Sequence, residues 1–193
     1  MITSMFDIIC VTSRKLCNTD FLTRIEEIAS SHPAGIILRE KDLSESDYAL
    51  LAEQVLEICQ RYDTPCILHN FYQIAIRLGC RRIHLPLPVL GALTDGEKAA
   101  FDIIGASCHS IEDALSAVQL GASCVTAGHI FDTDCKKGLP GRGIPFLKDL
   151  CASVPVPVYA IGGISPANIA SVKEAGAAGA CMMSSFMTNA FSI

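Results

Sequence analysis

The stretch Ala160-Ile161-Gly162-Gly163-Ile164-Ser165-Pro166 joins the end of an apolar run to the expected start of a helix. The apolar run itself, Val156–Ile161, predicts a buried strand. Two successive glycines then predict a loop whose backbone can approach a ligand closely. Serine caps helices and proline is tolerated in their first turn, so Ser165 and Pro166 predict a helix start. The stretch therefore predicts a strand–loop–helix unit.

Similar units recur from one end of the chain to the other. The predicted strands are Asp7–Val11, Ala34–Leu38, Cys66–Leu68, Arg82–Leu85, Asp102–Ala106, Ser123–Ala127, Val156–Ile161 and Gly179–Met183. Helix starts are marked by Ser44 with Asp47 and by Ser110 with Asp113, and helix ends by Gly79, Gly121 and Gly176. Eight such units predict an α/β protein, a single (β/α)8 TIM barrel over residues 1–193 with a short final helix. An open, doubly wound sheet is the alternative.

The composition restricts the classes of function. The chain is 50% hydrophobic and 18% charged, with a formal net charge of −5. Nucleic acids and membrane surfaces favour basic patches, so we expect neither as a partner. The ten cysteines form no C-x-x-C pair and mostly lie in apolar runs, which is typical of buried free thiols. No secretory signal is recognised, and we expect a reduced, cytoplasmic protein.

The loops after the seventh and eighth strands predict a phosphate site. Gly162 and Gly163 offer free N–H groups, and Ser184 and Ser185 follow the eighth strand with hydroxyl groups. Barrels often bind phosphate between these two loops. The alternative is that the glycine pair only forms a tight turn.

His129 is the predicted acid/base. It follows Gly128 at the end of the sixth strand, where loops of a barrel build the active site, and imidazole exchanges protons near neutral pH. The long, glycine-containing loop behind it could act as a lid. His109 after the fifth strand is either a pocket residue or a local hydrogen-bonding group, and His84 could point inward or outward.

Charged residues follow the second strand. Arg39 and Lys41 suit a carboxylate or a phosphate, although a solvated charge cluster would look the same. A Schiff base on Lys41 and a nucleophilic pairing of Cys108 or Cys135 with a histidine are less favoured readings. Carboxylates do not converge at the strand ends in a metal-binding pattern, so we expect no metal and no cofactor.

These motifs, in this order, resemble the thiamine phosphate synthase superfamily. The resemblance covers nearly the whole chain and is carried by the segments 38–44, 107–110, 128–138, 160–164 and 183–184. It implies one of two activities. The synthase joins a pyrimidine pyrophosphate to a thiazole phosphate with magnesium, and its paralogue is a thiazole tautomerase.

Departures from the synthase pattern favour the tautomerase. The synthase has an Asn-Asp pair after the third strand, where this chain has Asn70-Phe71. It has a Gln-x-x-Asp-like element after the fourth strand, where this chain has Pro86-Leu87-Pro88, and a glutamine at the position of Ile37. Loss of the metal carboxylates should stall a magnesium-dependent displacement. The Gly128–Gly138 loop is similar to that of the tautomerase.

We therefore expect a thiazole tautomerase that isomerises a carboxylated dihydrothiazole phosphate to the aromatic thiazole by proton transfer at His129. The resemblance assigns substrate binding to Arg39, Lys41, Asn70, Ser107, His109, Thr133 and Lys136. The expected partner is the phosphorylated thiazole, and a homodimer is compatible with the sequence. The alternatives are a divergent thiamine phosphate synthase, a non-catalytic thiazole-phosphate sensor, and another isomerase on the same scaffold.

Overall fold

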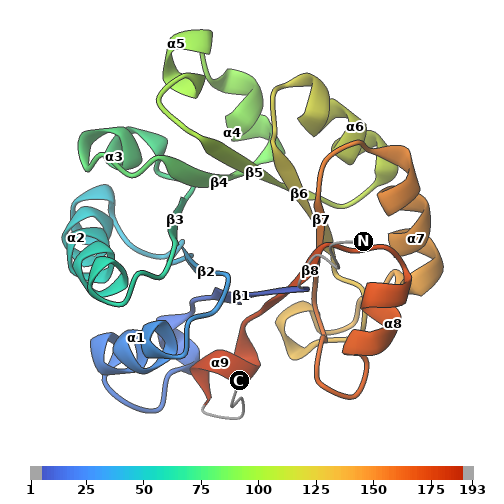
Figure 1. Ribbon diagram of the computed structural model, residues 1–193, viewed down its shortest axis with the longest axis horizontal. Helices are drawn as coiled ribbons and strands as arrows, with labels where there is room; N and C mark the ends of the chain where they lie inside the picture. The colour runs from blue at the N-terminus through green and yellow to red at the C-terminus, as the bar shows by residue number, and fades with distance from the viewer. Residues whose placement is uncertain (1–5, 189–193) are drawn as a thin grey trace.

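The computed structural model describes residues 6–188, which form a closed barrel of parallel strands in the order β1-β2-β3-β4-β5-β6-β7-β8 (Figure 1). The strands are β1 (Asp7–Val11), β2 (Gly35–Leu38), β3 (Cys66–His69), β4 (Arg82–Pro86), β5 (Ile103–Cys108), β6 (Cys124–Gly128), β7 (Val158–Ile161) and β8 (Gly179–Met182). The predicted barrel is confirmed and the open sheet is wrong. That one domain also includes the two ends of the chain stays a prediction, because residues 1–5 and 189–193 lie outside the described part.

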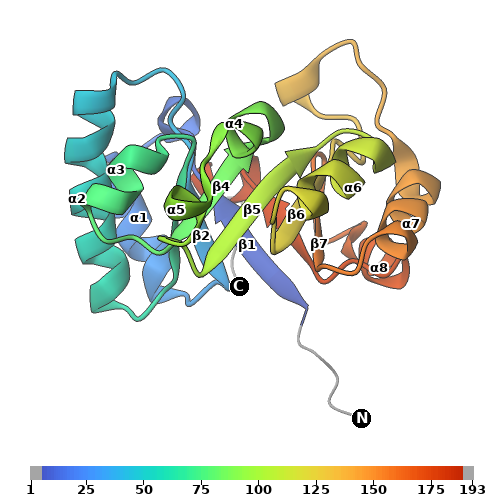
Figure 2. The same ribbon diagram turned by 90° about the horizontal axis from the view of Figure 1, so that it is seen from above.

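Helices surround the strands (Figures 1 and 2). They are η1 (Arg14–Leu16), α1 (Phe21–Ser30), α2 (Glu45–Arg61), α3 (Tyr72–Arg77), α4 (Leu87–Ala92), α5 (Asp95–Lys98), α6 (Ile111–Gln119), η2 (Asp134–Lys136), α7 (Gly143–Ser153), α8 (Ile169–Glu174) and α9 (Ser184–Met187). The short final helix is thus present as α9. Within the described residues, no helix combines the length and apolarity needed to cross a membrane.

Several predicted helix signals are confirmed. Ser44 and Ser110 accept hydrogen bonds from the N–H groups of Asp47 and Asp113, respectively. Gly79, Gly121 and Gly176 have φ of 67°, 95° and 93°, the left-handed conformation that favours glycine after a helix.

The predicted helix start at Ser165 is wrong. The helix α8 begins at Ile169, and Asn168 occupies the position before it. The side-chain oxygen of Asn168 accepts from the N–H of Ser165, and its own N–H donates to the Ser165 carbonyl. Because this turn is closed by asparagine, the helix starts later than the Ser-Pro pattern indicates.

The core has two layers. The larger layer lies between strands and helices and includes Leu68, Ile83, Leu85 and Val125. Because side chains alternate along a strand, the intervening residues face the barrel interior. On β1, β2 and β8 the interior is apolar and is built around Ile9, Val11, Ile37 and Cys181.

Barrel closure needs a small residue at the start of β8. A Cβ atom at Gly179 would lie 2.8 Å from the Cβ of Asp7 on β1 and 2.8 Å from a ring carbon of Tyr159 on β7. The Tyr159 hydroxyl donates to the Asp7 carboxylate at 3.0 Å, so β7 and β1 also interact directly past β8.

Tyr48 fastens α2 to two neighbouring strands. Its hydroxyl donates to the carbonyl of Leu38 on β2 at 2.8 Å and accepts from the N–H of His69 on β3 at 2.9 Å. The side chain is fully buried. Loss of the hydroxyl would therefore leave two buried backbone groups without a partner.

We predict that Tyr48→Phe lowers the free energy of unfolding by about 1–3 kcal/mol, the cost of unpaired buried polar groups. Urea denaturation measures this. Tyr62→Phe is the matched control, because within residues 6–188 the Tyr62 hydroxyl bonds only to the partly exposed carboxylate of Glu26 at 3.0 Å. Equal losses in the two variants would contradict the prediction.

Candidate functional site

The carboxyl ends of the strands meet at one rim of the barrel, and the segment between β6 and α7 rises above it (Figure 2). Hydrogen bonds between the two ends of this segment hold it in place. The His129 ring shares a hydrogen bond of 3.1 Å between its Nε2 and the carbonyl of Leu139. The carboxylate of Asp132 accepts from the N–H of Gly141 at 2.7 Å. His129 therefore helps to hold the loop that follows it.

The twin-glycine corner packs directly against His129. Gly162 and Gly163 have φ of 98° and 65°. A Cβ atom at Gly162 would lie 2.8 Å from the Cα of His129, and one at Gly163 would lie 2.7 Å from the Cβ of Phe131. Both glycines are thus required by their backbone conformation and by close packing. The tight turn therefore explains part of the reason why this corner has two glycines.

Peptide N–H groups at this corner remain available for an anion. Among residues 6–188, those of Gly162 and Gly163 have no hydrogen-bond acceptor, and the same holds for Ser184 and Ser185. Ser184 is exposed and Ser185 is half-buried. Free N–H groups in a turn can bind an anion, so this corner is a suitable phosphate site. Phosphate binding itself stays a prediction.

Three cations from two loops converge on the rim. Arg39 and Lys41 follow β2, and Lys136 lies in η2. Partial desolvation lowers the pKa of Lys41, and the charges of Arg39 and Lys136 lower it further. Lys41 therefore lies close enough to each of the other two cations to be repelled by them, which favours an anionic ligand beside it.

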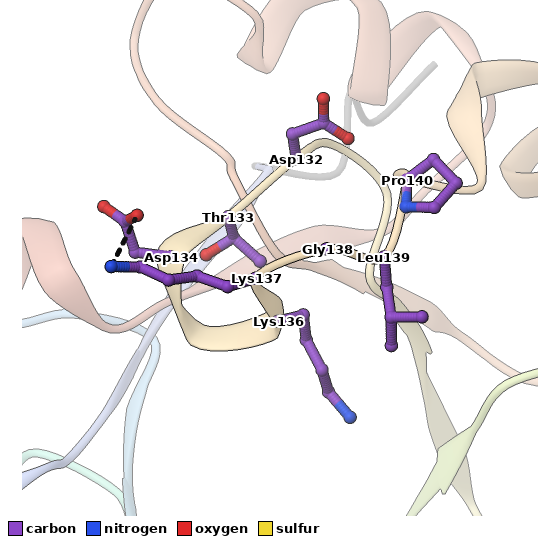
Figure 3. A pocket seen from close by; sticks show the side chains of 8 residues that line it. All are labelled: Asp132, Thr133, Asp134, Lys136, Lys137, Gly138, Leu139 and Pro140. Atoms are coloured by element: carbon purple, nitrogen blue, oxygen red, sulfur yellow. Dashed lines mark ion pairs between the residues drawn. The ribbon is translucent and has the colours of Figure 1, made fainter.

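Lys136 also borders a cavity of about 680 Å³ within the segment between β6 and α7, lined by Asp132, Thr133, Asp134, Lys136, Lys137, Gly138, Leu139 and Pro140. Figure 3 shows that Lys136 points away from the ion pair formed by Asp134 and Lys137 at 3.8 Å. Lys137 thus lies beside a carboxylate in a solvent-exposed pair, whereas Lys136 makes no ion pair within the described residues.

Two histidines lie inside the barrel below these cations. His69 and His84 alternate with the outward-facing Leu68 and Ile83, and their rings stack with centroids 5.7 Å apart. The Nε2 atom of His84 bonds to the hydroxyl of Thr126 at 3.0 Å, and its Nδ1 atom has no partner among residues 6–188. The open question of where His84 points is thereby answered: it points inward.

His84 crosses over β5 to reach β6, and this needs a glycine on the strand between them. A Cβ atom at Gly105 would lie 2.7 Å from the Cδ2 atom of His84. Thr126 was not recognised from the sequence. The alternation of side chains along β6 could have identified it: Val125 and Ala127 face the helices, so Thr126 between them faces the interior.

Both interior imidazoles are neutral at pH 7. Desolvation lowers the pKa of His69 to about 2, and the neighbouring His84, Lys41 and Arg39 add to the shift. Desolvation followed by Lys41 and Arg39 lowers the pKa of His84 to about 4. These side chains therefore present neutral hydrogen-bonding groups beneath a cationic rim.

The remaining predicted residues have mixed surroundings. Asn70 has φ of 69° and no side-chain hydrogen bond within the described residues, and half-buried Ser107 lies at the carboxyl end of β5. The Nδ1 atom of His109 lies 3.0 Å from the carbonyl of Gly128. Thr133 is partly occupied by local structure, since its hydroxyl accepts from the N–H of Cys135 at 3.4 Å.

The rim does not fit the magnesium that the synthase uses. Phe71, at the position of one expected aspartate, packs its ring 4.5 Å from that of Tyr48. Leu87 and Pro88 start α4 where the second carboxylate element is expected. Within residues 6–188, no group of three or more His, Cys, Asp or Glu side chains is arranged to hold a metal ion.

Comparison with known proteins identifies the relatives. The family model described as thiamine monophosphate synthase matches residues 8–186. A thiamine-phosphate synthase of Lacticaseibacillus paracasei is 35% identical over 170 residues, 86% of this chain and 79% of that one. One of Fusobacterium nucleatum is 34% identical over 182 residues, 92% of this chain and 87% of that one. The solved thiamine phosphate pyrophosphorylase of Pyrococcus furiosus superposes with a TM-score of 0.81 at 24% identity, covering 96% and 89% of the two chains.

These relatives confirm the superfamily and overturn the predicted activity. Proteins 30–35% identical over most of the chain carry the name thiamine-phosphate synthase, so the prediction of a thiazole tautomerase is wrong. The departures at Phe71 and Leu87 concern the magnesium site and that at Ile37 a single glutamine position, so they do not by themselves indicate a different reaction. The coarser prediction, an enzyme of thiamine biosynthesis, is supported by the same relatives.

We predict that Gly162→Ala destabilises the protein more than Gly79→Ala. Both replace a glycine of positive φ, which costs about 1–2 kcal/mol for an L-residue. At Gly79 no atom of the described part of the chain lies within 4 Å of the added Cβ, whereas at Gly162 it meets His129, and such overpacking costs about 1–3 kcal/mol more. Thermal unfolding measures the loss of stability, and titration with inorganic phosphate measures the effect on anion binding at the corner. Unchanged phosphate affinity in Gly162→Ala would exclude the corner as the anion site.

Acid should weaken the protein through His69 and His84. Their folded pKa values lie below the unfolded value of about 6.5. The unfolded chain therefore binds more protons below pH 6.5, and stability falls as pH drops from about 6.5 towards 4, by at most about 1.4 kcal/mol per pH unit for each ring. Urea denaturation across this range measures the slope.

NMR titration of the ring protons provides the direct check, because neither ring should protonate above about pH 5 in the folded protein. His69→Asn should flatten the acid slope. His32→Asn is the matched control, since His32 is exposed and its φ of 51° suits asparagine. Equal slopes in both variants would show that the buried ring is not responsible.

Proposed function

Because the chain belongs to the thiamine monophosphate synthase family, we propose that it is a thiamine-phosphate synthase. The resemblance noted from the sequence implies a transferase that joins a pyrimidine diphosphate to a thiazole phosphate. The family match over residues 8–186 is the observation that carries this proposal. The geometry of the rim supports it.

Two separate places at the rim suit the two anionic groups of these substrates. The free N–H groups of Gly162 and Gly163 suit a phosphate monoester such as that of the thiazole. The cluster of Arg39, Lys41 and Lys136 suits the more highly charged diphosphate. Substrates held in this way would place their rings between the two anchors, over the interior histidines.

Charge on the leaving group is the main demand of this reaction. Breaking the bond between carbon and the diphosphate oxygen leaves the electron pair on that oxygen, so negative charge increases there. Preorganised cations stabilise such charge strongly in a partly desolvated site. Since the rim does not fit magnesium, we assign this task to Arg39, Lys41 and Lys136.

The histidines have supporting roles in this proposal. Joining the two rings through nitrogen and carbon requires no transfer of a carbon-bound proton, so an acid/base at His129 is not needed. His129 instead holds the loop that carries Lys136, through its bond to Leu139. Neutral His69 and His84 are hydrogen-bonding groups that lie beneath the rim.

We further propose a cytoplasmic location, which suits a chain whose ten cysteines are all free thiols. Phosphorylated small molecules are the proposed partners. Pairing into a homodimer is a prediction that light scattering would test.

The direct test is formation of thiamine phosphate. Purified protein is incubated with the pyrimidine diphosphate and the thiazole phosphate, with magnesium in one arm and with EDTA in the other. We expect product in both arms. No product in either arm would refute the synthase, whereas product only with magnesium would refute the assignment of the leaving-group charge to the cations alone.

A binding experiment tests the cationic cluster separately. We predict that Lys41→Ala weakens binding of inorganic pyrophosphate roughly 10- to 100-fold, as expected for loss of a charge-assisted hydrogen bond worth about 1.5–3 kcal/mol. Calorimetric titration measures it. Arg61→Ala is the control, because exposed Arg61 on α2 pairs, among the residues that the structure describes, only with Glu26 at 2.9 Å. An unchanged affinity in Lys41→Ala would remove this residue from the site.

A further inference from the structure

The amino ends of β3 and β4 border a second cavity, of about 460 Å³, at the opposite end of the barrel from the candidate site. Three of its lining residues are cysteines from three different segments. Cys59 lies in the last turn of α2, Cys66 begins β3, and Cys80 lies between α3 and β4. None of them belongs to the proposed synthase site.

The three thiols are neighbours within this cavity. Cys59, Cys66 and Cys80 are 1%, 6% and 8% exposed, so a reagent must enter the cavity to reach them. The Cys80 thiol lies 3.7 Å from the carbonyl oxygen of Cys66 and 3.4 Å from that of Arg82. Cys80 is thus held by backbone carbonyls, and Cys66 interacts with Cys59.

The interaction between Cys59 and Cys66 makes the two thiols unequal. A hydrogen bond from the Cys66 thiol lowers the pKa of Cys59, and the same bond raises the pKa of Cys66. The charge of Arg82, at the border of the cavity, acts on Cys66, where it only partly offsets this rise in pKa. Thiolate rather than thiol is the reactive form of cysteine. Cys59 is therefore suited as the attacking sulfur and Cys66 as its partner.

We propose that Cys59 and Cys66 form a peroxide-reactive dithiol site that closes to an intramolecular disulfide. In the first step the Cys59 thiolate attacks hydrogen peroxide, so that an S–O bond forms, the O–O bond breaks, and the departing hydroxide takes a proton to become water. In the second step the Cys66 sulfur, giving up its proton, attacks the Cys59 sulfenic acid. An S–S bond forms, and a second water leaves.

The electrons balance without another reactant. The two thiols lose two electrons and two protons, and one hydrogen peroxide becomes two waters. A peroxide is small enough for a cavity of this size, and Arg82 at its border carries no ion pair within the described residues. Arg81, by contrast, is engaged with Asp102 through two bonds of 2.7 Å.

The sequence allows a sharp test, because trypsin separates the three cysteines. Cleavage after Lys41, Arg61, Arg77 and Arg81 places Cys59 in peptide 42–61, Cys66 in 62–77 and Cys80 in 78–81. Reduced protein is treated with equimolar hydrogen peroxide in the presence of a chelator. Remaining thiols are blocked with N-ethylmaleimide before digestion and mass spectrometry.

We expect peptides 42–61 and 62–77 to be joined, and dithiothreitol to separate them. Cys59→Ser should abolish this product, whereas Cys80→Ser, the matched control from the same cavity, should retain it. A disulfide between 62–77 and 78–81 in the wild type would overturn the assignment. So would independent oxidation of the cysteines without a disulfide between Cys59 and Cys66. Thiamine phosphate formation is not used as a readout, so failure of the proposed synthase activity would not affect this result.

Discussion

Closure of the sheet between β1 and β8 is the constraint on which the site depends. Only in a closed barrel do the loops after β2, β6, β7 and β8 face the same space. Gly179 allows this closure because any side chain there would meet Asp7 and Tyr159. The cations after β2 and the glycine corner after β7 are far apart in sequence, and the cylinder brings them to one rim.

A second constraint joins the corner to the loop above it. Gly162 and Gly163 pack on His129 and Phe131, so the turn after β7 and the start of the long loop form one packed unit. His129 in turn bonds to Leu139 near the other end of that loop. Displacement of the loop would therefore disturb the corner, and an anion at the corner would help to order the loop that carries Lys136.

The fold was predictable because its signals are local and repeated. Apolar strands, serine caps and terminal glycines each report their own segment, and their order defines a barrel. The helix start predicted at Ser165 was wrong because an asparagine three residues later closes the turn. The glycine corner and Lys41 could be recognised as candidate anion-binding groups for the same local reason. The inward orientation of His84, its contact with Thr126 and the thiol cluster could not, since they depend on contacts between strands. The activity was misjudged because substitutions at a metal site were read as a change of reaction.

The contact between His84 and Gly105 has a consequence for how this chain can vary. The imidazole lies in the space that a side chain at position 105 would occupy, with 2.7 Å between the added Cβ and the ring. Neither position is free to diverge by itself: a larger residue at 105 requires a smaller one at 84, and Thr126 then loses its partner on β4. Three adjacent strands thus share one coupled position, and descendants of this sequence should exchange these residues together or retain them all.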